Sequence, residues 1–158
     1  MKFNTILVPL DGSALAEAAL PKALELAEVS GARVLLLRAA QAQTLPGVDP
    51  TETQVKVVSE AEAYLAEIQK RLTSQGRVKV ETSVWYGPAA YAIVEAARVR
   101  RVDEIVMTTH GRSGLGRLLL GSVAESVLRG TTTPILLLRV EGAPVQPPSG
   151  QANAWVAP

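Results

Sequence analysis

The sequence predicts an α/β protein with a doubly wound, five-stranded parallel sheet. Short runs of aliphatic and β-branched residues alternate along the chain with segments whose apolar residues recur at helical spacing. The length of 158 residues, with 47% apolar and 20% charged residues, suits one domain with a complete core. Strands that alternate with helices imply right-handed crossovers, so we expect parallel strands with helices on both faces.

The first third of the chain predicts a strand, a helix and a second strand. Residues 5–10 (TILVPL) and 33–40 (RVLLLRAA) are the two apolar runs. Between them, Ser30-Gly31 ends a helix in the usual way. Proline removes a backbone hydrogen bond inside a helix, so Pro21 predicts a kink near residues 17–21 without a break. One face of this helix carries apolar residues at i, i+3, i+4 and i+7, namely Leu20, Ala23, Leu24 and Ala27.

The middle of the chain predicts a loop, a long helix and a strand. Residues 41–50 read as the loop, and Gly76 ends the helix. In residues 78–87, valines and a threonine alternate with more polar residues, which predicts a strand near an edge of the sheet. The apolar face of the long helix steps by three and four residues through Val58, Ala61, Leu65, Ile68 and Leu72.

The last part predicts two further helix–strand units. Residues 104–109 form a short buried strand, 122–129 a short helix and 134–140 (PILLLRV) the final strand. Such an apolar strand at a sheet edge would invite pairing with another chain, unless helices alone cover it. The helix before residues 104–109 has an apolar face made of Ala90, Ile93, Val94 and Ala97.

We expect one domain over residues 1–140, followed by an extension over residues 141–158. The extension is rich in Pro, Gly, Ala and Gln and has no periodicity, so it does not predict a core of its own. Trp155 and Val156 could dock on a neighbouring surface.

Composition excludes several kinds of site and partner. The net charge of +1 gives no reason to expect nucleic acid or an anionic membrane as a partner. The chain has no cysteine and one histidine, which excludes disulfides, thiol catalysis, Cys-based zinc sites and multi-histidine metal sites. The apolar stretch at the N-terminus is too short for a signal sequence or a membrane span, so we expect a cytoplasmic protein.

Unusual chemistry follows two of the predicted strands. The first strand ends in VPLDGS, which contains Asp11, and the fourth ends in MTTHGRSG, which contains His110 and Gly111. In an open parallel sheet, ligands bind beyond the C-terminal strand ends where the strand order reverses. If the order reverses between these two strands, Asp11 faces one crevice with the glycine-rich loop, which lies in residues 107–125 (MTTHGRSGLGRLLLGSVAE).

The glycine-rich loop has the parts of an anion site. Gly111 permits a positive φ, and Gly121-Ser122 opens a helix whose first amides have no partner within the helix. Arg112 is the better of two arginines for a phosphate contact, and Arg117 could point away. The dinucleotide fingerprint G-x-G-x-x-G is missing after the first strand, and the P-loop pattern is missing as well. A dehydrogenase or a P-loop NTPase is therefore disfavoured.

The two segments ILVPLDGS and THGRSGLGRLLLGSVAESVLRGTTTPILLL resemble the universal stress protein family over roughly residues 1–140. ATP-binding members carry the motif G-x2-G-x9-G-[ST]. Gly111, Gly121 and Ser122 match this motif, whereas Thr108 occupies its first glycine position. The threonine adds a side chain where the ribose or the phosphates would pass.

The resemblance implies a Rossmann-like fold with strand order 3-2-1-4-5 and an adenine nucleotide, ATP or AMP, across strands one and four. It implies that adenine and ribose lie beside Pro9, Leu10 and Asp11, with backbone groups of Ala39 at the adenine edge. The ribose and inner phosphates would contact Met107, Thr108, His110 and Gly111, and the outer phosphates Gly121, Ser122, Val123 and Ala124.

The resemblance also implies a magnesium or manganese ion held through the phosphates, with no metal ligand assigned to a side chain. It implies a homodimer paired through the last strand, residues 134–140. The function that follows is an adenine-nucleotide-binding stress-response or sensor protein rather than a fast enzyme. Two alternatives stay open: a slow ATPase in which Asp11 holds metal or orients water, and an interaction protein without nucleotide.

Several of these residues also have interpretations that involve no ligand or catalysis. Asp11 could cap the first helix, and Ser122 with Glu125 forms an S-x-x-E capping-box pattern. A lone histidine such as His110 is more often a structural hydrogen-bonding residue than a catalyst. The chain offers no base and acid arranged around Ser113 or Ser122, so no catalytic residue is assigned.

Overall fold

The computed structural model describes residues 2–43, 46–74, 76–109 and 120–141. Five strands alternate with helices in these ranges, as the sequence predicts. The strands are β1 (Thr5–Pro9), β2 (Arg33–Ala40), β3 (Val80–Tyr86), β4 (Glu104–Thr108) and β5 (Ile135–Leu138). The helices are α1 (Ala14–Glu17), α2 (Leu20–Ser30), α3 (Pro50–Thr73), α4 (Ala89–Val99) and α5 (Ser122–Gly130).

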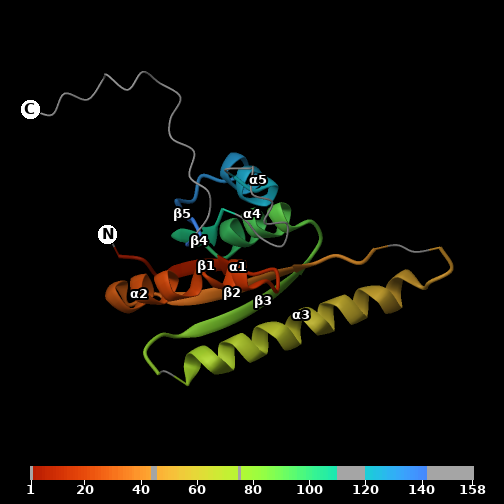
Figure 1. Ribbon diagram of the computed structural model, residues 1–158, viewed down its shortest axis with the longest axis horizontal. Helices are drawn as coiled ribbons and strands as arrows, with labels where there is room; N and C mark the ends of the chain where they lie inside the picture. The colour runs from red at the N-terminus through yellow and green to blue at the C-terminus, as the bar shows by residue number, and fades with distance from the viewer. Residues whose placement is uncertain (1, 44–45, 75, 110–119, 142–158) are drawn as a thin grey trace, which may run out of the picture.

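All five strands are parallel and lie in the order β3-β2-β1-β4-β5, which confirms the predicted topology. The chain moves outward from β1 to β3 and then returns to the other side of β1. Ile6 pairs with Glu104 and Leu7 with Ile105 across this return. The strand order therefore reverses between β1 and β4 (Figure 1).

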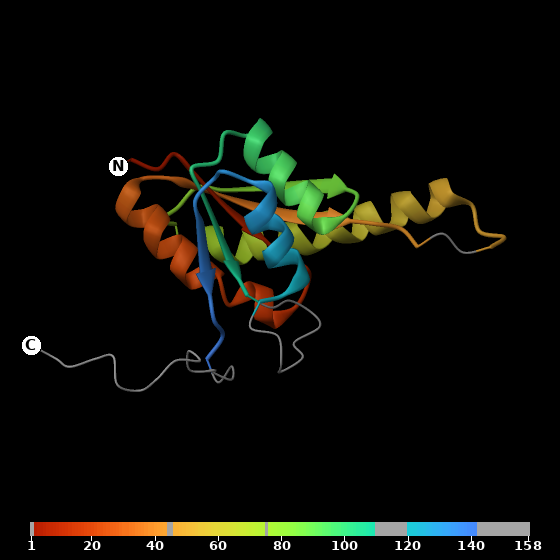
Figure 2. The same ribbon diagram turned by 90° about the horizontal axis from the view of Figure 1, so that it is seen from above.

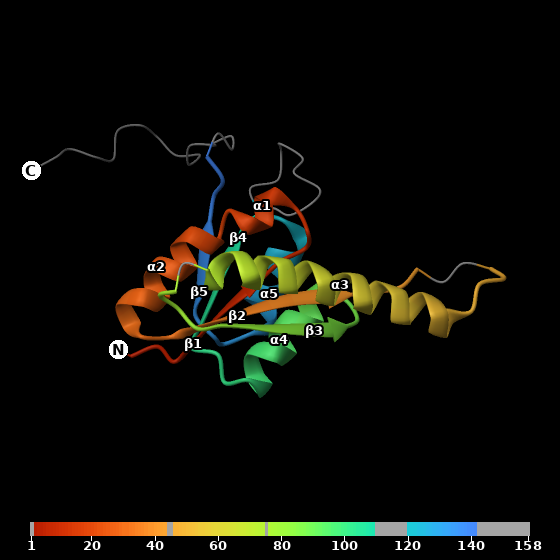
Figure 3. The same ribbon diagram turned by 90° about the horizontal axis from the view of Figure 1, so that it is seen from below.

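Helices cover both faces of the sheet. Alternate residues of each strand point to opposite faces, so β1 places Ile6 and Val8 in one core cluster and Leu7 in the other. The first cluster packs under α1, α2 and α3, and the second under α4 and α5. Figure 2 shows α4 and α5 on the near side of the sheet, and Figure 3 shows α2 and α3 on the opposite side.

The segment after β1 forms two helices, so the prediction of one kinked helix was wrong. Pro21 has no N–H to donate to the carbonyl of Glu17, and α1 ends at Glu17. The amide of Ala19 donates to the carbonyl of Ala16 over 3.2 Å, a tighter turn than an α-helix makes. Pro21 then lies in the first turn of α2, where its missing N–H costs nothing.

The two edges of the sheet differ. β3 forms one edge, which confirms the prediction from its alternating polarity. β5 forms the other edge and is shorter than predicted, at Ile135–Leu138 rather than residues 134–140. The side chains of β5 are half-buried, whereas those of β4 from Ile105 to Thr108 are buried.

The long helix α3 begins at Pro50, where the side chain of Asp49 accepts a hydrogen bond from the amide of Thr51. Its buried residues are Ala61, Leu65, Ile68 and Leu72, all in the part that lies against the sheet. The first part of α3 extends past the sheet (Figures 1 and 3). This extension places residues near the middle of α3 beside the C-terminal ends of the strands.

None of the helices in the described ranges is both long and apolar enough to span a bilayer. The predicted extension begins at Glu141, but residues 142–158, with Trp155 and Val156, lie outside the described residues. The division into a domain and an extension therefore stays a prediction.

Candidate functional site

A cleft of about 510 Å³ lies at the C-terminal ends of the strands, where the strand order reverses. The ends of β1, β2 and β4 form its floor, and the N-terminus of α5 forms one side. Val57 and Glu60 of α3 line it from one face of the sheet, and Ala89 and Ile93 of α4 line it from the other.

The structure brings together all the sequence-predicted site residues that it describes. Each of them lines this one cleft, although they come from four separate stretches of the chain. His110, Gly111 and Arg112 lie outside the described residues, as does Arg117. The predicted residues in the cleft are Pro9, Leu10, Asp11, Ala39, Met107, Thr108, Gly121, Ser122, Val123 and Ala124.

Asp11 lies in a tight turn directly after β1. Its Oδ1 accepts hydrogen bonds from the amide of Ser13 over 2.9 Å and from Ser13 Oγ over 2.5 Å. Ser13 Oγ in turn accepts a hydrogen bond from the amide of Ala16, so Ser13 is the N-cap of α1. The alternative that Asp11 itself caps the first helix was therefore wrong. The turn holds the Asp11 carboxylate at the cleft.

The backbone of Ala39 faces the space beyond the C-terminal end of β1. The carbonyl of Leu37 accepts a hydrogen bond from the amide of Leu10 over 2.8 Å, so the peptide groups of Leu37 face β1. Peptide groups two residues apart on a strand face the same side. Those of Ala39 therefore face the cleft beyond the end of β1, where they can meet the edge of a flat ring.

The ends of β4 and α5 meet at the cleft. The amide of Gly121 donates to the carbonyl of Thr109 over 2.6 Å, and the amide of Thr109 donates to the carbonyl of Leu138 over 2.9 Å. Thr108 and Thr109 are both buried, although they are polar. The N-terminus of α5 is thus anchored directly to the end of β4.

The first turn of α5 presents amide donors to the cleft. Gly121 is the N-cap and makes no side-chain capping bond, so the capping box at Ser122 does not form. Glu125 instead bonds to Arg129 with its side chain. The first helical hydrogen bond runs from the amide of Glu125, so the three preceding amides have no partner within the helix. Together with the helix dipole, these amides favour an anionic group.

Arg38 is a residue of the cleft that sequence reasoning missed. Its guanidinium lies 4.7 Å from the centroid of the Tyr64 ring, a cation–π contact between β2 and α3. Burial and the hydrogen bond that the Tyr64 hydroxyl donates to Glu17 raise the pKa of this tyrosine, so the phenol stays protonated. No motif marks Arg38, because it lies within the apolar strand β2 and its aromatic partner lies on a helix that is distant in the sequence.

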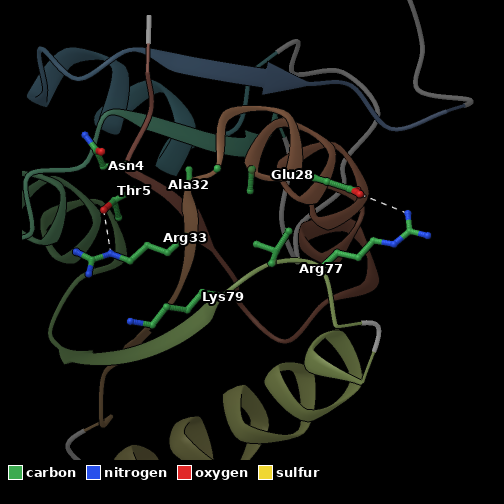
Figure 4. Close-up of a pocket in the computed structure, with 10 residues that line it drawn as sticks. Asn4, Thr5, Glu28, Ala32, Arg33, Arg77 and Lys79 are labelled. Atoms are coloured by element: carbon green, nitrogen blue, oxygen red, sulfur yellow. Dashed lines mark hydrogen bonds and ion pairs between the residues drawn. The ribbon is translucent and has the colours of Figure 1, made fainter.

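A second hollow of about 420 Å³ lies at the opposite ends of the strands (Figure 4). Arg33, Arg77 and Lys79 line it. Arg33 and Lys79 pair with Glu81 over 3.5 and 2.9 Å, and Arg77 pairs with Glu28 over 3.4 Å. Each of these three cations thus forms an ion pair with an acidic neighbour. The hollow also lies at the other end of the sheet from the cleft where the strand order reverses.

Within the described ranges, no cluster of three or more His, Cys, Asp or Glu residues could hold a metal ion. Asp11 is the one acidic side chain among the predicted residues of the cleft.

Residues 2–139 match the model of the universal stress protein family. The chain belongs to this family. Universal stress protein MJ0531 of Methanocaldococcus jannaschii is 32% identical over 142 residues, which cover 87% of this chain and 82% of the relative. Membership agrees with the resemblance carried by the segments around Asp11 and Ser122.

Solved structures of universal stress proteins share the fold of this member. MJ0577 of Methanocaldococcus jannaschii has 30% identity and a TM-score of 0.79, and the match covers 89% of this chain and 99% of that one. A universal stress protein in complex with cAMP has 25% identity and a TM-score of 0.68, with 87% of this chain and 98% of that one covered. A relative with this fold thus binds an adenine nucleotide.

Proposed function

We propose that this universal stress protein binds an adenine nucleotide, ATP or AMP, and acts as a stress-response or sensor protein in the cytoplasm. One observation carries the proposal: the cleft at the reversal of strand order combines an anchored carboxylate at Asp11 with the amide donors of the first turn of α5. The carboxylate can accept hydrogen bonds from ribose hydroxyls, and the amides can donate hydrogen bonds to phosphate oxygens.

The size and polarity of the cleft support a nucleotide. A volume of about 510 Å³ lies in the range of small-molecule sites. Apolar side chains such as Leu10, Ile93 and Met107 line it beside the polar groups, which suits a flat base next to a sugar and phosphates. The backbone groups of Ala39 would meet the polar edge of adenine. The relative in complex with cAMP supports the same ligand class.

The outer phosphates would lie over the N-terminus of α5, in contact with Ser122, Val123 and Ala124. His110 and Gly111 would contact the ribose and the inner phosphates, and Arg112 would contact a phosphate. A magnesium or manganese ion would be held through the phosphate oxygens. Thr108 lines the cleft at the motif position that is glycine in ATP-binding members. Its side chain would narrow the path of the phosphate chain, so we expect AMP to bind at least as well as ATP.

A titration of melting temperature tests this proposal. The protein is heated with ATP, AMP or GTP at millimolar concentration in the presence of Mg²⁺. A ligand at 100 times its Kd stabilises a protein by about 2.7 kcal/mol, so binding should raise the melting temperature by several degrees. The proposal fails if neither adenine nucleotide shifts the transition. Mass spectrometry of small molecules that co-purify with the protein provides an independent check.

We also propose a homodimer that pairs through β5. This strand is at the edge of the sheet, and its side chains from Ile135 to Leu138 are aliphatic and half-buried. An apolar edge strand presents peptide groups that a second copy can pair with. Sedimentation of the full chain should give the mass of a dimer, and a monomer at high micromolar concentration would contradict this part of the proposal.

A further inference from the structure

The guanidinium of Arg38 is a donor group without an acceptor among the described residues. It lines the cleft and is half-buried, and its guanidinium stacks over the ring of Tyr64. No side-chain nitrogen or oxygen in the described residues is both buried and unpartnered, so the Arg38 nitrogens reach the solvent of the cleft. A guanidinium carries five N–H donors and no acceptor.

The ring of Tyr64 lies under the Arg38 guanidinium, while the Tyr64 hydroxyl bonds to another residue. The Tyr64 hydroxyl donates to Glu17 Oε1 over 2.9 Å, and Arg71 donates to Glu17 Oε2 over 2.8 Å. Both carboxylate oxygens of Glu17 are thus engaged by other partners. The aromatic ring therefore orients the guanidinium, and the Glu17 carboxylate that holds the ring makes its hydrogen bonds to Tyr64 and Arg71.

The guanidinium lies against the turn that carries Asp11. A Cβ atom added to Gly12 would lie 3.1 Å from Arg38 Nη1 and 3.3 Å from Nη2. Gly12 follows Asp11 directly, and both Asp11 and Arg38 line the cleft. An acceptor and a set of donors thus lie at neighbouring positions on the α3 side of β1.

We propose that Arg38 is a specificity-determining residue that, with Asp11, recognises the vicinal 2′,3′-diol of a ribonucleotide. This inference rests on the proposed function and goes beyond it, because it makes the site selective for ribose over deoxyribose. A hydroxyl both donates and accepts, so a diol can donate to the Asp11 carboxylate and accept from the Arg38 guanidinium. Tyr64 is a positioning residue that acts through Arg38.

The charges around Arg38 favour a neutral diol over a second phosphate at this end of the cleft. The acidic side chains of the described lining are Asp11 and Glu60, and its one cation is Arg38. A phosphate on the ribose would meet two carboxylates for one guanidinium. A diol adds no charge and satisfies the donors and the acceptor together.

Binding of ATP, 2′-deoxy-ATP and 3′-deoxy-ATP in the presence of Mg²⁺, measured by calorimetry, tests this proposal on the full chain. A hydrogen bond to a charged group is worth about tenfold or more in affinity, so the wild-type protein should prefer ATP over at least one analogue by about tenfold. In Arg38→Met the preference over the analogue whose missing hydroxyl would face Arg38 should fall below about twofold, whereas a preference that depends on the Asp11 contact should remain. Arg77→Met removes an exposed arginine at the opposite hollow and should leave the preference unchanged.

Variants of Tyr64 separate positioning from folding. Tyr64→Phe keeps the ring under the guanidinium and should retain most of the preference for ribose. Tyr64→Leu removes the ring and should reduce that preference severalfold, with a smaller effect on deoxy-ATP. If Arg38→Met does not fold, Arg38→Lys keeps the charge and loses the planar fork, and a weakened preference is again expected.

Three results overturn the proposal. Equal binding of ATP and both deoxy analogues by the wild-type protein excludes recognition of the diol. Unchanged preferences over both analogues in Arg38→Met, or in Arg38→Lys where only that variant folds, exclude the role of Arg38. If no adenine nucleotide binds at all, the proposed function fails together with this inference, whereas ATP binding without discrimination overturns this inference alone.

Discussion

The amide of Gly121 donates to the carbonyl of Thr109 over 2.6 Å, and both residues line the cleft. This bond anchors α5 to the end of β4 and aims the first turn of the helix at the space beyond β1. The amide of Gly121 is used by its own chain, and the donors that remain for a ligand are those of Ser122, Val123 and Ala124.

Gly121→Asp should separate stability from nucleotide binding. Gly121 has an extended conformation (φ −69°, ψ 152°) that suits other residues, and aspartate caps a helix slightly better than glycine. Its charge also favours the helix N-terminus, so we expect stabilisation by about 0.5 kcal/mol. The same charge would repel phosphate and lower the affinity for ATP by tenfold or more. Thermal melts and calorimetry measure the two effects.

Gly121→Asn is the matched control, because asparagine caps as well as aspartate and adds no charge. It should retain a clearly larger share of the ATP affinity than Gly121→Asp. Equal affinities in the two variants would show that no anionic group lies near the N-terminus of α5.

Gly12→Ala should weaken nucleotide binding by displacing Arg38. Gly12 has φ of +86°, and the added Cβ would meet the Arg38 guanidinium at 3.1 Å. Gly47 has φ of +82° with nothing within 4 Å, so Gly47→Ala has the same backbone strain without the contact. Both changes should cost about 1 kcal/mol of stability, and only Gly12→Ala should reduce the affinity for ATP. Similar affinities in the two variants would contradict this prediction.

Glu81→Gln should lower the stability at neutral pH by roughly 1 kcal/mol or less. The hydrogen bond from Lys79, with the charges of Arg33 and Arg100, lowers the pKa of Glu81 below its ordinary value of 4.5. A carboxyl with a lowered folded-state pKa stabilises the protein above its unfolded pKa, and this contribution is lost as the pH falls through the folded value. The difference in free energy of unfolding between wild type and variant should therefore shrink below about pH 4.5.

Glu104→Gln should raise the stability at neutral pH. Glu104 begins β4 beside Ile6 of β1, and desolvation by burial raises its pKa. A raised carboxyl pKa means that stability falls as the pH rises from the unfolded value through the folded one. The neutral amide avoids this loss. Chemical unfolding at pH 4 and pH 7 should show a gain only at the higher pH, and a loss at pH 7 would contradict the prediction.

Leu137→Pro should prevent dimerisation through β5 and preserve the sheet of the monomer. The carbonyls of Pro134 and Leu138 accept hydrogen bonds from the amides of Ile105 and Thr109. The peptide groups of Leu137, one residue out of step with these, therefore face away from the sheet. Proline removes an outward N–H that a second copy would need. Leu137→Ala loses similar packing and keeps the N–H, so it should remain dimeric in sedimentation. A dimeric Leu137→Pro would show that the copies pair elsewhere.

Local sequence patterns determined the elements of this fold and the outline of its site. The alternation of aliphatic runs with helical periodicity predicted five parallel strands, and the residues after β1 and β4 predicted where the cleft lies. The cleft contains every predicted residue that the structure describes, because the C-terminal ends of parallel strands share one edge.

Only the tertiary structure decided which groups act together. The segment around Pro21 forms two helices, α1 and α2, joined by a tight turn at Ala19, where the sequence predicted one kinked helix. Arg38 meets Tyr64 because α3 crosses β2, a contact between residues that are 26 positions apart and share no motif. Periodicity reports which face of an element is buried, whereas the partner of a polar side chain depends on how the elements pack.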